Sequence, residues 1–212
     1  MDPTRTEGAE VRDANFKRIF ALDKPLPPYR SISEIAEERK QDPVEVIIEM
    51  ALARHLKQFF LQTLANEDQD EVLAMIRHPR TIPTFSDSGA HVSQIMDSSL
   101  QTHLLSYWVR EKQALTLEDA VRRITSLPAS CWGLEGRGLI REGYVADLIV
   151  FDPDTIGPQM PELAYDLPAG APRLKQKADG LLATVVNGRV LLRNNEHTGA
   201  QPGQLLRGPL AR

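Results

Sequence analysis

The sequence predicts an α/β chain in which a mostly helical first part, residues 1–132, precedes a small β region, residues 133–212. In the first part, apolar residues recur at helical spacing behind capping residues. One short apolar run there, residues 81–85, has the pattern of a strand. After Gly133 glycines become frequent, and a β-branched apolar run and an Asn-Gly pair indicate strands joined by tight turns.

Capping residues define the helices of the first part. Asp42 followed by Pro43 is a strong start signal for a helix, which the apolar spacing extends to about Leu64. Further helices are predicted over residues 31–40, 66–77, 97–111 and 116–124, whereas residues 15–22 fit either a strand or one short helix.

The β region has two clear signals. Residues 146–151 form a continuous apolar run, which is typical of a buried strand. Residues 183–186 and 189–192 flank Asn187 and Gly188, and this arrangement is the strongest short hairpin signal. Residues 166–173 are rich in proline and glycine and are predicted to form a loop.

Composition excludes several classes of protein. With 212 residues, 42% hydrophobic, the chain can bury a real core. The net charge of −4 and the lack of a basic run give no indication of a nucleic-acid or membrane-surface partner. A single cysteine, Cys131, excludes an internal disulfide framework and favours a reducing, cytoplasmic location. We expect no membrane span and no signal peptide.

The main candidate site is the hexapeptide from Ser86 to His91, which directly follows the predicted strand. An aspartate at the C-terminal end of a strand, here Asp87, is where α/β barrels place catalytic groups. Asp and Ser before Gly also form ordinary turns and helix caps, and spacing alone favours this second interpretation.

The other histidines have structural interpretations. His55 lies beside the apolar stripe of the predicted helix that starts at Pro43, and His78 lies at a helix end before proline. His103 could line a site together with Tyr107 and Trp108, but aromatic residues at helical spacing are more often part of a core.

Several segments carry a resemblance to a known family. Residues 116–121, 125–129 and 138–152 resemble the C-terminal end of the amidohydrolase superfamily, where the last helices of a barrel lead into a small β-sandwich. Within that superfamily, the chain resembles the N-acyl-D-amino-acid deacylase, or D-aminoacylase, group. The matching segments are residues 166–173, 186–188 and 197–203.

The resemblance implies the C-terminal part of a metal-dependent TIM-barrel hydrolase that cleaves non-peptide amide C–N bonds in a small molecule. It implies zinc or another divalent metal, which lowers the pKa of the attacking water. By resemblance, Asp87 would be catalytic and a metal ligand, and would pass a proton from water to the leaving nitrogen. His91 is a candidate substrate-binding residue, or a cap of the next helix.

The sequence departs from the family at its metal ligands. The family site uses a His-x-His motif and further histidines, whereas no two of the five histidines here have that spacing. A catalytic zinc needs three protein ligands, and a full barrel needs about 250 residues. We therefore expect a part of a longer amidohydrolase that is inactive alone or completed by an upstream half of the barrel. The alternative is a non-catalytic remnant or interaction module.

A second departure concerns the substrate. D-aminoacylases place an arginine shortly after the catalytic aspartate to bind the substrate carboxylate. The corresponding residues here, 96–100, contain no arginine, and the next one is Arg110. An amidohydrolase of different specificity therefore remains open.

A partial barrel exposes sheet edges and apolar helix faces, so we predict that a soluble monomer of the chain expressed alone is hard to obtain. Light scattering coupled to size exclusion, followed by thermal unfolding, measures this. A monomer with one cooperative transition would contradict the prediction.

Overall fold

A computed structural model describes residues 14–207 of the chain. The chain forms two compact units, Met1–Glu67 and Asp68–Arg212. The sequence predicts a boundary near Gly133, between barrel residues and the β region. That boundary does not coincide with the division between the two units, and it stays a prediction. Every helix among the described residues is too short or too polar to span a bilayer.

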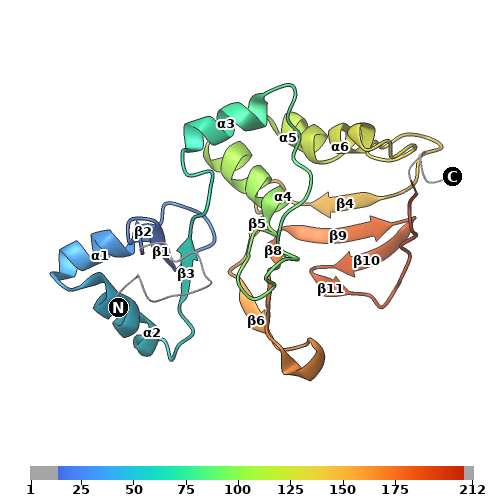
Figure 1. Ribbon diagram of the computed structural model, residues 1–212. Coiled ribbons are helices and arrows are strands. Elements are labelled where there is room, and N and C mark those ends of the chain that lie inside the picture. Colours follow the sequence, from blue (N-terminus) through green and yellow to red (C-terminus); the bar gives the residue numbers. More distant parts are fainter. Residues whose placement is uncertain (1–13, 208–212) are drawn as a thin grey trace. The chain divides into compact units, whose positions relative to one another are not determined.

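The first unit combines a small antiparallel sheet with two helices (Figure 1). Its core contains apolar residues from both layers, namely Ala21, Ile32, Ile35, Ala36 and Val46. Of residues 15–22, which fit either a strand or a short helix in sequence, residues 19–22 form a strand. The elements are β1 (Ile19–Leu22), which pairs with both β2 (Arg30–Ser31) and β3 (Phe59–Gln62), followed by α1 (Ile32–Arg39) and α2 (Pro43–Ala53).

The helix starts in this unit are confirmed, but one helix end is wrong. Ser31 caps α1 in a capping box, in which its hydroxyl accepts from the Glu34 N–H at 3.2 Å. The helix predicted to reach Leu64 ends at Ala53. His55, with φ of 52°, is therefore an exposed residue after the helix rather than a packing residue on it. The apolar residues after it pair with β1, so tertiary pairing overrides helical spacing here.

The helices of the second unit bury the predicted aromatic residues. Tyr107 and Trp108 are both 5% exposed and belong to the core, as their spacing indicates. They lie in η2, a π-helical segment that continues α4. The elements are α3 (Gln69–Arg77), α4 (Leu100–His103), η2 (Leu104–Glu111), α5 (Leu117–Ile124) and α6 (Ser126–Cys131).

The strand predicted over residues 81–85 is absent. The segment between α3 and α4 contains no strand or helix, and Phe85 is 74% exposed. A strand forms only where a neighbour satisfies its backbone groups, and no strand of the described residues pairs with this segment. The part of the fold that would place Asp87 at a strand end is therefore a loop.

The β region of the second unit contains three small sheets (Figure 1). The largest has the order β11-β10-β9-β4. It comprises β4 (Leu148–Phe151), β9 (Leu181–Val186), β10 (Arg189–Arg193) and β11 (Glu196–His197). Two strand pairs complete the region: β5 (Gly157–Pro158) with β8 (Ala178–Asp179), and β6 (Glu162–Ala164) with β7 (Arg173–Lys175). The short helix η3 (Pro168–Gly170) lies between β6 and β7.

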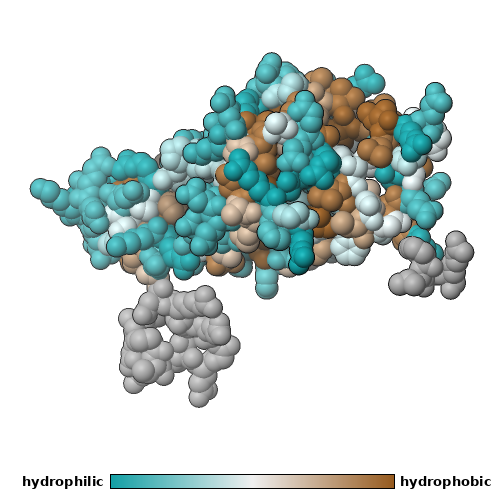
Figure 2. Space-filling view, turned by 90° about the horizontal axis from the view of Figure 1, so that it is seen from above, coloured by the Kyte–Doolittle hydropathy of each residue, from teal (hydrophilic) through white to brown (hydrophobic). Residues whose placement is uncertain are grey.

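The Asn-Gly hairpin is confirmed, whereas the burial predicted for residues 146–151 is wrong. Asn187 and Gly188 both have positive φ, 47° and 73°, as a two-residue hairpin turn requires. β4 is a strand, but it lies at the edge of its sheet, and Ile149 and Val150 are 60% and 48% exposed. Hydrophobic side chains also gather on the face that carries α5 and α6 (Figure 2).

Two glycines with positive φ allow a matched stability test. A Cβ at Gly180 would lie 2.5 Å from the Ile156 backbone nitrogen, whereas a Cβ at Gly188 would meet nothing within 4 Å. We predict that Gly188→Ala costs about 1–2 kcal/mol, from left-handed strain alone. Gly180→Ala should cost a further 1–3 kcal/mol or so, because backbone must move. Urea unfolding of both variants measures the difference, and equal losses would contradict it.

Candidate functional site

The loop between α3 and α4 carries the candidate residue Asp87. The Asp87 carbonyl accepts from the Ala90 N–H at 2.8 Å, which closes a turn. The Asp87 N–H donates to the Asp97 carboxylate at 3.1 Å, so the middle of the loop is joined to its C-terminal end. The Asp87 side chain is exposed, and its carboxylate is accessible from solvent.

His91 lies further along the same loop. It is exposed and has φ of 45°, and its carbonyl accepts from the N–H groups of Gln94 and Ile95 at 2.7 and 3.1 Å. Its backbone thus closes a single turn. α4 begins only at Leu100, with Ser99 as its N-cap residue. Whether the His91 side chain binds substrate stays a prediction.

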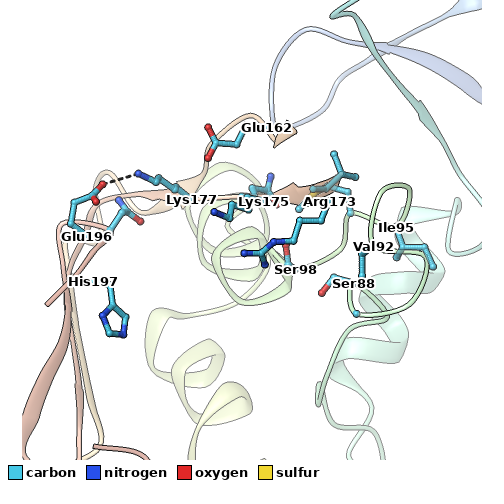
Figure 3. Close-up of a pocket in the computed structure, with 15 residues that line it drawn as sticks. Ser88, Val92, Ile95, Ser98, Glu162, Arg173, Lys175, Lys177, Glu196 and His197 are labelled. Atoms are coloured by element: carbon cyan, nitrogen blue, oxygen red, sulfur yellow. Dashed lines mark hydrogen bonds and ion pairs between the residues drawn. The ribbon is translucent and has the colours of Figure 1, made fainter. Parts of the chain in front are cut away.

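A cleft of about 650 Å³ lies beside this loop. Ser88, which directly follows Asp87, lines one wall, and the strands β6, β7 and β11 supply residues of the other (Figure 3). A backbone hydrogen bond of 2.8 Å from the Leu174 N–H to the Val92 carbonyl fastens the loop to β7. Asp87 and His91 are next to lining residues but do not themselves line the cleft.

Three cations from β7 and the residues after it line this cleft: Arg173, Lys175 and Lys177. Alternate residues of an extended strand face the same side, which explains their common direction. Arg173 binds both oxygens of Asp166, with Nε–Oδ1 of 2.6 Å and Nη2–Oδ2 of 2.8 Å. Lys175 Nζ lies 2.7 Å from the same Oδ2. The Arg173 guanidinium, with the Lys175 ammonium, holds the pKa of the Asp166 carboxyl well below its usual range.

The far end of the cleft is polar as well. Lys177 forms an ion pair of 2.8 Å with Glu196, drawn as a dashed line in Figure 3, which raises the pKa of Lys177 and lowers that of Glu196. His197 Nδ1 accepts a hydrogen bond from the Gly199 N–H at 2.9 Å. The buried Oε1 of Gln176 has no hydrogen-bond partner among the described residues, and so offers an acceptor.

The remaining histidines are structural. His78 is the C-cap residue of α3, as predicted, and its Nδ1 accepts from the Arg80 N–H at 3.2 Å. His103 stacks on Tyr107 with ring centroids 5.0 Å apart, and burial lowers its pKa. Neither histidine lines the cleft.

The described residues do not fit a metal site of three ligands. Within residues 14–207, no three side chains of His, Cys, Asp or Glu come together closely enough to hold an ion. A catalytic zinc normally needs three such ligands. The nearest other carboxylate along the loop is that of Asp97. It already accepts a hydrogen bond from the Asp87 backbone N–H.

Comparison with known proteins identifies the family. A model described as "Amidohydrolase family" matches residues 6–192. The chain belongs to the amidohydrolase family. This amidohydrolase is 34% identical over 182 residues to an N-acyl-D-aspartate deacylase from Alcaligenes xylosoxydans xylosoxydans, an alignment that covers 84% of the chain and 32% of the relative. The chain thus spans about a third of the length of the curated relatives it matches.

Solved structures support the same group. The fold matches a crystal structure of D-aminoacylase, said to define a novel subset of amidohydrolases, with a TM-score of 0.53 and 25% identity. That match covers 83% of this amidohydrolase and 34% of the D-aminoacylase chain. A D-aminoacylase mutant in complex with copper chloride matches with a TM-score of 0.52 and 25% identity, over 89% and 37% of the two chains. The resemblance to D-aminoacylases is therefore confirmed.

Sequence reasoning missed the cations of the cleft. The proline and glycine of residues 166–173 predict a loop, yet Arg173 begins a strand, and residues 173, 175 and 177 are all basic. The signal was present as Arg-x-Lys-x-Lys. The contact between this strand and the loop after Asp87 could not be predicted from the sequence, because more than 70 residues separate the two segments.

The Asp166 carboxyl allows a pH test. Its depressed pKa means that the ion pair is fully present above the unfolded value, near 3.9, and is lost only as pH falls through the lower folded value. We predict that NMR titration of the Asp166 side-chain carbon has a midpoint below the usual range of an aspartate. Arg173→Gln should raise this midpoint. An unchanged midpoint in Arg173→Gln would contradict the assignment.

Proposed function

We propose that this chain is the C-terminal part of a metal-dependent amidohydrolase that hydrolyses the amide C–N bond of a small N-acyl amino acid. The observation that carries the proposal is the family match over residues 6–192, which includes the loop of Asp87. The similarity to an N-acyl-D-aspartate deacylase supports an N-acyl amino acid with an acidic side chain as substrate.

Asp87 is the proposed catalytic carboxylate. It would accept a proton from the attacking water and return it to the leaving nitrogen, a transfer for which a carboxylate of suitable pKa is competent. Its exposed side chain and its place next to Ser88 on the cleft wall support this role. Asp97 would act as a positioning residue, because its carboxylate holds the Asp87 backbone N–H. His91, four residues after Asp87, is proposed to contact the substrate.

The metal of the family is zinc or another divalent ion. Asp87 is proposed as one of its ligands, and the other ligands must come from residues outside those described, in an upstream half of the barrel. Residues 14–207 alone do not bring three such ligands together. A reducing cytosol remains the proposed location, since Cys131 is exposed and is not in a disulfide.

A non-catalytic interaction module is the second candidate. The lack of a three-ligand group among the described residues favours it. The two candidates differ in one measurable respect: the enzyme gains stoichiometric metal and amide hydrolysis when the adjacent upstream reading frame is co-expressed, and the module gains neither.

We predict that Asp87→Ala, in that co-expressed complex, lowers kcat for hydrolysis of N-acetyl-D-aspartate by about 10²–10⁴-fold, the usual contribution of acid–base catalysis. Asp154→Asn, which removes an exposed carboxylate outside the cleft lining, is the matched control and should keep full activity. Retained activity in Asp87→Ala would contradict the catalytic assignment.

A further inference from the structure

Arg173 and Lys175 together hold one carboxylate in the structure. Three charge-assisted contacts of 2.6–2.8 Å converge on Asp166, two from the guanidinium and one from the ammonium. Paired N–H donors of arginine match the two oxygens of a carboxylate, and a lysine supplies additional charge. The two cations thus bind a carboxylate group in the structure, that of Asp166.

The carboxylate that occupies this pair is replaceable. The Asp166 side chain is 40% exposed, and those of Arg173 and Lys175 are 39% and 40% exposed. Exposed ion pairs contribute little to stability, so replacing the Asp166 carboxylate by another anion costs little free energy. Asp166 belongs to the Pro/Gly-rich segment between β6 and β7, and it does not itself line the cleft.

The pair and the loop of Asp87 line the same cleft. Arg173 and Lys175 lie in its lining together with Ser88 and Ser98 of the loop (Figure 3). The bond between Leu174 and Val92 keeps β7 against this loop. A small molecule in the cleft would therefore meet the cations of β7 and the residues next to Asp87 together.

We propose that Arg173 and Lys175 form the carboxylate-recognition element of this cleft, and that Asp166 is a resident carboxylate which a carboxylate of the bound molecule replaces. This inference rests on the proposed function for the identity of the substrate. The binding of a carboxylate by the two cations is independent of that function, because binding requires neither a metal nor hydrolysis.

The proposal is tested by NMR titration of the chain, co-expressed with the adjacent upstream reading frame, with N-acetyl-D-aspartate and with its neutral diamide. We expect binding of the carboxylate form in preference to the diamide. Arg173→Ala should weaken this binding by about tenfold or more, the value of a lost charge-assisted hydrogen bond. Asp166→Asn should tighten it, because the internal competitor is gone. Arg189→Ala, an exposed arginine of β10 outside the cleft lining, is the matched control.

The opposite signs of the two variants separate recognition from a structural role. If Asp166 and Arg173 only stabilise the β6–β7 pair, both variants weaken binding or neither changes it, and either result overturns the proposal. Equal binding of the acid and the diamide also overturns it. Arg173→Lys, which keeps the charge, replaces Arg173→Ala if the latter fails to fold, and should bind with intermediate affinity. A protein that binds the carboxylate but does not hydrolyse N-acetyl-D-aspartate would contradict the proposed function. It would not contradict carboxylate recognition by Arg173 and Lys175.

Discussion

The shape of the candidate site depends on one backbone hydrogen bond, from Leu174 to Val92. The loop between α3 and α4 has no helix or strand of its own, so nothing regular fixes its course. The bond of 2.8 Å to β7 and the contact of Asp87 with Asp97 are its main constraints. Through them the β region, far along the chain, determines where the segment around Asp87 lies within the second unit.

Local chemistry made much of the fold predictable. Ser31, Asp42 and Thr116 begin helices at the expected residues because each cap depends only on its own first turn. The hairpin at Asn187 and Gly188 was predictable for the same reason. The errors have a common origin in distant partners. The apolar residues after Ala53 left the helix to pair with β1, and residues 81–85 found no strand to pair with.

The candidate site was predictable only in its acidic part. Asp87 could be singled out because an aspartate before glycine at the end of an apolar run is a recognisable local pattern. The cations opposite it could not, since their relevance comes from tertiary contact. The cations that line the cleft come from residues 173–177, far along the chain from the loop that lines it with them.

The edge strand β4 has a consequence for handling the protein. Within the described residues, its outer backbone groups pair with no other strand, and the apolar side chains of Ile149 and Val150 are exposed there. Natural sheets protect such edges with lysine, proline or a bulge, because an unprotected edge is a template for intermolecular strand pairing. Ile149→Lys would place a charge at this edge. It would thereby oppose fibrillar association at the concentrations that spectroscopy and crystallisation need.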